Sequence, residues 1–220
     1  MARPKKVRPD PPDLPAGWDP APPALESGAQ WDGVQAGAEC HVPQELSGVE
    51  LRECRWVRAD LAGRRITGLR CRDVTFEHCD LSGAVLDGAV LTRVRFTACR
   101  LTGLQLGGAE LADVRISDCR ADLVNLRMAR ARHLLVENTP SPALDLYSFT
   151  GTDCSLLGCD LTGVNLTEAR FTNLQLHGSV VEDVTGAAAL RGARISPDQI
   201  VPIGAALLAA LDIRATDPPA

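Results

Sequence analysis

The stretch CDLSG AVLDG AVLTR VRFTA CRLTG LQLGG, residues 79–108, decides the fold, because a large apolar residue, Leu or Phe, stands at the third place of every group of five. The same phase runs through twenty-eight consecutive pentads over residues 44–183, and only Ser141 and Gly151 break the apolar rule at this central place. Two places before each central residue stands a second, mostly apolar series of smaller side chains. The sequence is therefore an internal repeat with a period of five residues.

A period of five residues fits neither an α-helix nor a flat strand. Five steps of about 100° leave about 140° of drift per repeat, so the apolar residues would spread around the whole helix. In a flat strand the side chains alternate between two faces, which suits two inward residues separated by one but not the three-residue step to the next inward residue. Each pentad is therefore predicted to be a short strand with two inward side chains, followed by a bend.

The spacing of the glycines indicates how many bends close one coil. Two places after the central residue, where a bend with positive φ would favour glycine, two series recur every twenty residues. These are Gly48, Gly68, Gly88 and Gly108, and Gly63, Gly83, Gly103 and Gly163. Two kinds of corner that repeat at twenty residues imply four pentads per coil. We therefore expect an all-β fold, a four-sided β-solenoid of about seven coils whose interior is filled with side chains.

The repeat resembles the pentapeptide-repeat family, whose motif reads small–Asp/Asn–Leu/Phe–Ser/Thr–Gly. Matching stretches are ADLAG at 59–63, CDLSG at 79–83, CDLTG at 159–163, VNLTE at 164–168 and ARFTN at 169–173. The resemblance implies a right-handed quadrilateral β-helix, and the handedness comes from the resemblance alone. Residues 139–153 depart from the motif, so we expect a distorted coil or a bulged loop there and not a domain boundary.

The composition of the chain ends predicts five segments. Residues 1–30 carry eight of the fifteen prolines and are predicted to be a disordered arm. Residues 31–43 are predicted to cap the first coil, and residues 44–185 to form the solenoid. Residues 186–214 are interpreted as a short helical cap or a dimerisation segment, and residues 215–220 as a disordered tail.

The C-terminal segment contains a helix start at Ser196-Pro197-Asp198-Gln199, with Ser as N-cap, Pro at the first helical place and Gln three places after the cap. Pro202 is expected to end or kink that turn, and a second helical stretch is expected to follow. The apolar residues of that stretch outnumber what one solenoid end must bury: Ile203, Leu207, Leu208 and Leu211. Two interpretations stay open, a cap folded on the last coil and a homodimer interface as in the quinolone-resistance members of the family.

No motif in the sequence indicates an active site. Six of the eight cysteines occupy the small inward place, two before a central residue, where a thiol packs as a small apolar group, and no C-x-x-C pair is present. His78, His133 and His177 fall at outward places in different columns, and the glycines do not form a phosphate-binding motif. We therefore expect no enzymatic activity, no catalytic residue, no metal and no cofactor.

The lengths of the apolar runs and the position of the basic residues restrict the cellular compartment and the partners of the protein. No run approaches eighteen apolar residues, and the first thirty residues lack the apolar core of a secretory signal, so we expect no membrane contact, a cytoplasmic location and reduced cysteines. The basic cluster Lys5, Lys6 and Arg8 is interpreted as a solubilising tail, with a weak nucleic-acid contact as the alternative. Direct nucleic-acid binding is not expected.

Function is then expected on the outer columns of side chains, and two hypotheses compete. The resemblance implies the first, because the fluoroquinolone-resistance members of the family bind DNA gyrase by imitating duplex DNA, which requires carboxylates stacked along the axis. The candidate acids form two columns: Glu53, Asp73, Asp113 and Asp153, and Asp60, Asp80 and Asp160. Arginines interrupt both, and 19 acids stand against 16 arginines over residues 44–183, so mimicry is limited to part of the surface.

The second hypothesis is an interaction scaffold with an unidentified protein partner. The irregular segment 139–153 would be its contact, because loops on rigid scaffolds often carry recognition. Tyr147 lies there as a candidate anchor. Phe149 is either a second anchor or, since it stands in the inward phase, the filling of a widened coil.

Overall fold

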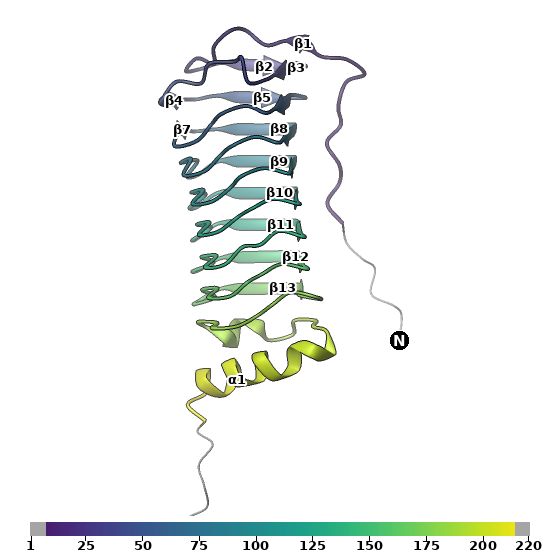
Figure 1. Cartoon of the computed structure of the whole chain (residues 1–220), viewed down its shortest axis with the longest axis vertical. Coiled ribbons are helices and arrows are strands. Elements are labelled where there is room, and N and C mark those ends of the chain that lie inside the picture. The colour runs from purple at the N-terminus through teal and green to yellow at the C-terminus, as the bar shows by residue number, and fades with distance from the viewer. Residues whose placement is uncertain (1–7, 214–220) are drawn as a thin grey trace, which may run out of the picture.

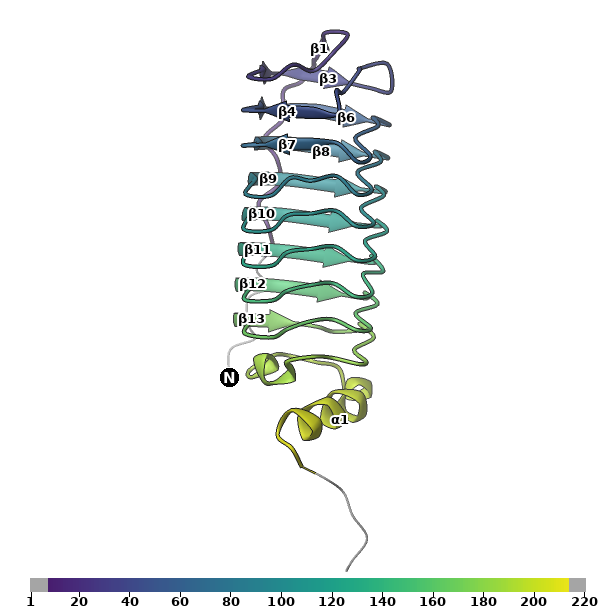
Figure 2. The same cartoon turned by 90° about the vertical axis from the view of Figure 1, so that its left-hand side faces the viewer.

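The computed structural model describes residues 8–213, which form a rod of stacked parallel strands (Figure 1). An extended N-terminal segment runs along the rod, and a helix lies beyond the last coil (Figures 1 and 2). The predicted disordered tail 215–220, and Lys5 and Lys6 of the basic cluster, lie outside the described residues.

Consecutive coils pair in parallel with a register of twenty residues. Leu51 lies opposite Cys71, Cys71 opposite Leu91, and Leu91 opposite Leu111. The strands are β1 (Asp19–Pro20), β2 (Gln30–Asp32), β3 (Val34–Ala36), β4 (Glu45–Ser47), β5 (Glu50–Arg52), β6 (Arg55–Val57), β7 (Arg65–Thr67), β8 (Arg70–Glu77), β9 (Val90–Thr97), β10 (Glu110–Ser117), β11 (Arg130–Glu137), β12 (Thr150–Leu157) and β13 (Arg170–Gln175). Since four pentads make twenty residues, this register confirms the four-sided solenoid of about seven coils.

Each coil has four sides, which we number in chain order. In one coil the first side is residues 110–112, the second 115–117, the third 120–122 and the fourth 125–127, and equivalent residues follow at steps of twenty. The first and second sides form the long strands. On the fourth side β4 pairs with β7, and elsewhere the third and fourth sides are turns joined by isolated bridges. The first side therefore lies opposite the third, and the second opposite the fourth.

The interior is filled with the central residues, apart from an apolar cavity of about 40 Å³ lined by Leu101, Leu126 and Phe149 among others. Leu81, Leu101 and Leu161 are each at most 2% exposed. On the second side the rings of Trp56 and Phe76 stack with their centroids 6.2 Å apart, and those of Phe76 and Phe96 at 4.9 Å. The described coils therefore leave their outer columns and their ends for recognition.

The N-terminal end differs from both predictions made for it. β2 and β3 lie in register with the next coil, with Gln30 opposite Glu50, so residues 31–43 belong to a first coil of the solenoid. The predicted disorder of residues 1–30 is wrong for residues 8–30, since Leu25 is fully buried and β1 pairs with β3 at the solenoid's edge. The proline content suggested too little apolar surface for burial, but the Leu25 side chain joins the core and anchors this segment.

The segment 139–153 is not the distorted coil or bulged loop that we expected. Its residues keep the twenty-residue register, with Ala131 opposite Gly151 and Gly151 opposite Phe171. Phe149 is buried and occupies part of the space that a side chain at residue 151 would need: a Cβ there would lie 2.9 Å from the Phe149 ring, 2.9 Å from the Phe171 ring and 2.8 Å from the Cys154 sulfur. The two departures from the motif therefore compensate each other within the core.

The C-terminal cap consists of η1 (Ala187–Leu190), η2 (Pro197–Gln199) and α1 (Ile200–Ala210). The predicted start is confirmed: the Ser196 N–H donates to Gln199 Oε1 (2.7 Å), and Gln199 Nε2 donates to the carbonyls of Leu176 (2.7 Å) and Ser179 (2.5 Å) in the last coil. Pro202 does not end a helix as expected. It is the third residue of α1, where a backbone N–H has no partner within the helix, so proline is tolerated.

The compensation between Phe149 and Gly151 generates a prediction about the core. In the other coils the column of Phe149 contains Ala89, Ala109, Ala129 and Ala169, and the column of Gly151 contains Leu91, Leu111, Ala131 and Phe171. Gly151→Leu alone is expected to lower the free energy of unfolding by about 3 kcal/mol or more through overpacking. Phe149→Ala alone is expected to cost about 3–5 kcal/mol through a cavity.

In the double variant Phe149→Ala/Gly151→Leu the Phe149 ring no longer meets the added side chain, whereas Cys154 and Phe171 still do. The double variant should therefore lose less free energy of unfolding than the sum of the two single losses. Denaturant unfolding of the four proteins measures the coupling. Additive losses in the double variant would contradict the proposed compensation.

Candidate interaction surfaces

The corner between the first and second sides carries the first predicted acidic column, in which charges are paired along the rod. Arg93 donates two hydrogen bonds to the Asp73 carboxylate, at 2.6 Å from Nε to Oδ1 and 2.5 Å from Nη2 to Oδ2. Two coils further, His133 Nδ1 lies 2.8 Å from Asp113 Oδ1, and His133 Nε2 lies 3.7 Å from Asp153 Oδ2. The column is therefore not a continuous line of unpaired negative charge.

Asp73 and Asp113 are also covered, with 4% and 7% of each residue exposed. The backbone N–H of Asp13 donates to Asp73 Oδ1 (2.9 Å), and that of Asp10 donates to Asp113 Oδ1 (3.2 Å). Burial by itself would raise the pKa of Asp73, but the hydrogen bonds from Arg93 and from the Asp13 N–H outweigh it and hold that pKa below the ordinary value of an aspartate. The sequence analysis missed these contacts because it placed the N-terminal segment in solution.

Glu53 and Asp153, at the two ends of this corner column, are less covered than the acids between them. Glu53 is exposed, and Asp153 is half-buried. Asn173 Nδ2 donates to Asp153 Oδ1 (2.5 Å) from the following coil. The four predicted acids of this corner therefore form two covered positions flanked by two that solvent reaches.

The second predicted column, on the third side, has a local structural role. The Asp60, Asp80 and Asp160 side chains each accept the backbone N–H two residues further on, at 3.0, 2.9 and 3.0 Å. Such Asx turns stabilise the bend. Asp60 is exposed, Asp80 and Asp160 are half-buried, and Arg100 lies loosely at 3.9 Å from Asp80. These three carboxylates remain accessible to a partner.

Charges are segregated between opposite sides of the rod. The outward places of the first side, over residues 50–172, hold six arginines and two glutamates, a net charge of +4: Arg52, Arg70, Arg72, Arg130, Arg132 and Arg170 against Glu50 and Glu110. Those of the third side, over residues 60–182, hold five acids and two arginines, a net charge of −3: Asp60, Asp80, Asp122, Asp160 and Glu182 against Arg100 and Arg120. The nearly neutral net charge of the repeat region therefore combines one basic side and one acidic side.

Tyr147, the candidate anchor, lies half-buried on the fourth side. The Arg127 guanidinium carbon lies 4.4 Å from its ring centroid, and the Tyr147 N–H donates to Asp145 Oδ1 (3.0 Å). Leu123 and Met128 on the preceding coil are both 62% exposed, and the sequence analysis missed them because they occupy corner places. Phe149 is core and is not part of this surface.

The four predicted C-terminal interface residues divide into two pairs. Ile203 is buried against the end of the solenoid, and Leu207 is partly buried there. Leu208 and Leu211 are 46% and 63% exposed. The structure adds three exposed apolar side chains that the sequence analysis did not single out: Ile200, Val201 and Ile213.

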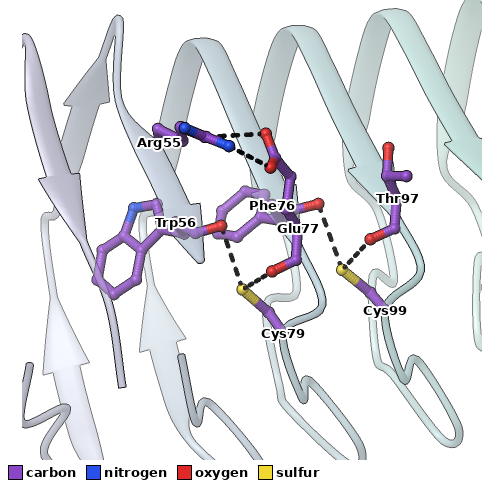
Figure 3. Close-up of polar contacts among 7 residues, drawn as sticks. All are labelled: Arg55, Trp56, Phe76, Glu77, Cys79, Thr97 and Cys99. Carbon is purple, nitrogen blue, oxygen red and sulfur yellow. Dashed lines mark hydrogen bonds and ion pairs between the residues drawn. The ribbon is translucent and has the colours of Figure 1, made fainter. Parts of the chain in front are cut away.

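The inward cysteines make hydrogen bonds to backbone carbonyls (Figure 3). The Cys79 thiol lies 3.4 Å from the Trp56 carbonyl oxygen and 3.5 Å from that of Glu77, and Cys99 repeats the arrangement one coil further. All eight cysteines are buried and unbridged. Burial raises the pKa of the Cys154 thiol to about 12, which disfavours the reactive thiolate.

Over residues 8–213, no group of three or more His, Cys, Asp and Glu side chains is arranged to hold a metal ion. Within the same part of the chain, no helix has the length and the apolar character needed to cross a membrane.

Comparisons with known proteins support the family assignment. The model of the pentapeptide repeat region matches residues 49–126, and that of pentapeptide repeats in eight copies matches residues 152–183, together half of the chain. A search of curated proteins found no match.

Two solved structures illustrate what the chain is similar to. HetL, a pentapeptide repeat protein involved in heterocyst differentiation regulation from the cyanobacterium Nostoc sp. strain PCC 7120, is 18% identical, with 82% of this chain and 88% of that chain covered and a TM-score of 0.40. Full-length QnrB1, a plasmid-mediated fluoroquinolone resistance protein, is 14% identical, with 84% and 94% covered and a TM-score of 0.42. With its five-residue period, its twenty-residue register and the two matching family models, the chain belongs to the pentapeptide-repeat family.

Proposed function

We propose that this protein is a non-enzymatic binding protein that forms a homodimer through α1 and holds protein partners along its sides. The exposed apolar surface of α1 carries the proposal. No charged residue stands between Asp198 and Asp212, and five large apolar side chains in and after the helix are exposed: Ile200, Val201, Leu208, Leu211 and Ile213. Contiguous apolar patches of this kind mark interaction sites on soluble proteins.

The arrangement of α1 favours a second copy of the chain as the occupant of this patch. Val201 and Leu208 share one stripe of the helix, because residues seven places apart lie on the same face, and Leu211 follows directly after the last helical residue. The patch lies at the tip of the rod, beyond the last coil (Figure 2). A twofold contact between two tips would cover both patches at once and leave the sides of both rods free.

The dimer predicts a clear effect of charge on α1. Val201→Glu/Leu208→Glu is expected to convert a dimer into a monomer, because two carboxylates per chain would be buried without partners in the interface. Size-exclusion chromatography with light scattering measures the mass. Leu123→Glu is the matched control, since Leu123 is equally apolar and 62% exposed but lies in the middle of the rod. An unmodified protein that runs as a monomer at high micromolar concentration would contradict the dimer.

A second candidate function is partial DNA mimicry toward DNA gyrase, which the family resemblance raised. The acids of the third side favour it over those of the corner column, because Asp60, Asp80 and Asp160 are accessible whereas Asp73 and Asp113 are covered. This line is short, since Arg100 and Arg120 interrupt it. Gyrase is therefore proposed as a partner of the third side only.

A supercoiling assay with purified gyrase, with and without a fluoroquinolone, tests this candidate. The unmodified protein is expected to inhibit supercoiling or to protect gyrase from the drug at micromolar concentration. Asp60→Asn/Asp80→Asn/Asp160→Asn should lose the effect, because Asn removes the charges but can keep the Asx turns. Glu50→Gln/Glu110→Gln on the opposite side is the matched control. No effect of the unmodified protein would rule out gyrase and leave the scaffold function.

A further inference from the structure

The N-terminal segment of residues 8–18 lies along the corner between the first and second sides and runs opposite to the direction in which the coils advance (Figures 1 and 2). Its two backbone donors reach acids two coils apart, Asp10 to Asp113 and Asp13 to Asp73. At its upper end the Arg55 guanidinium carbon lies 5.4 Å from the Trp18 ring centroid. We call residues 8–18 the arm and the surface beneath it the corner groove.

The spacing of the two donors matches the spacing of the two acids. Prolines at residues 9, 11, 12 and 15 favour a polyproline II conformation, which has three residues per turn and a rise of about 3.1 Å per residue. Donors three residues apart therefore point to the same side, about 9.3 Å apart. Two coils of a parallel solenoid advance about 9.6 Å at ~4.8 Å per strand. One turn of polyproline II thus fits two coils.

The residues between the acids set the charge of the preferred peptide. Arg93 lies on the coil between Asp73 and Asp113 and pairs with Asp73. The Asp13 carboxylate also lies near enough to Arg93 to raise the pKa of that guanidinium, although its Asp73 partner contributes most. An acidic side chain at the position of Asp13 is therefore attracted to the groove, while its N–H binds Asp73, the acid beside Arg93.

The second side forms the rest of the corner groove, where outward residues are covered. Leu135 is only 4% exposed although its place in the repeat points outward. A cavity of about 40 Å³ remains between the arm and this side, lined by Pro12, Arg95, Arg115 and Leu135 among others. Within the described residues, Nε of Arg95 and Nε of Arg115 are buried without an acceptor. The arm therefore fills the groove incompletely.

We propose that the corner groove is a binding site for an extended proline-rich peptide of a partner protein, in which two prolines stand between two non-proline residues and the second of these residues is acidic, and that the arm is its intramolecular occupant. In the arm this pattern is Asp10-Pro11-Pro12-Asp13. The two non-proline residues supply the N–H groups for Asp113 and Asp73, and the prolines preorganise the peptide. A partner peptide binds by displacing the arm. The cavity that the arm leaves unfilled gives a larger peptide room to make further contacts.

The test uses the full chain and a fluorescently labelled synthetic peptide with the sequence of residues 8–15, RPDPPDLP. Asp10→Pro/Asp13→Pro in the protein removes both backbone donors but keeps the polyproline II conformation, so the arm leaves and the groove stays unchanged. The labelled peptide should bind this variant at least about tenfold more tightly than the unmodified protein, because a groove that is ~90% occupied by its own arm binds with a tenfold weaker apparent affinity. Fluorescence anisotropy measures both affinities.

Two controls isolate the backbone donors. Asp10→Ala/Asp13→Ala in the protein keeps both N–H groups, so its arm should stay docked and the peptide should bind it more weakly than it binds the proline variant. A peptide with proline at both acidic positions should not bind the proline variant. Equal affinity of the original peptide for the unmodified protein and the proline variant, absence of binding to that variant, or equal binding of the all-proline peptide would each overturn the proposal. Light scattering on the same samples reports the dimer separately.

Discussion

Hydrogen bonding between coils in a fixed register of twenty residues is the constraint on which the rest of the structure depends. Each backbone N–H of a strand binds the carbonyl of the adjacent coil, so side chains twenty residues apart are stacked along the axis. A stacked column repeats any chemical feature at the strand spacing. Core residues therefore form columns of leucine, aromatic rings or thiols, and surface residues form columns of charge.

The five-residue pattern predicted the architecture well, because burial imposes the same requirement on every coil. The inward positions of Leu81, Leu101 and Leu161, the four sides and the helix start at Ser196 all follow from places that a solid core or a backbone bend restricts. The expected distortion at residues 139–153 was wrong, because each departure from the motif was judged within its own column. Phe149 is larger than most residues of its column, and Gly151 is smaller than those of its own column. The sequence does not show that the Phe149 ring lies where a side chain at residue 151 would lie.

The binding surfaces were less predictable, because their properties depend on which columns face solvent and what covers them. Asp73 and Asp113 occupy the same place in the repeat as the more accessible acids Glu53 and Asp153, yet the arm covers Asp73 and Asp113. Proline-rich composition gave no indication of this, since the same residues that prevent ladder formation also allow polyproline II packing. The spacing of Asp10 and Asp13 contains the relevant signal only once the two-coil distance is known.

The opposite charges of the first and third sides give the rod a transverse electric dipole. A net charge of +4 faces one direction and −3 the other, so a charged macromolecule exerts a torque that turns the rod about its long axis before contact. Strongly negative surfaces meet the arginine side first, and positive ones meet the aspartate side. In dilute salt this orientation acts over a Debye length of about 30 Å, and at physiological ionic strength over about 8 Å. Oppositely charged neighbours would therefore be attracted to different flanks of the rod.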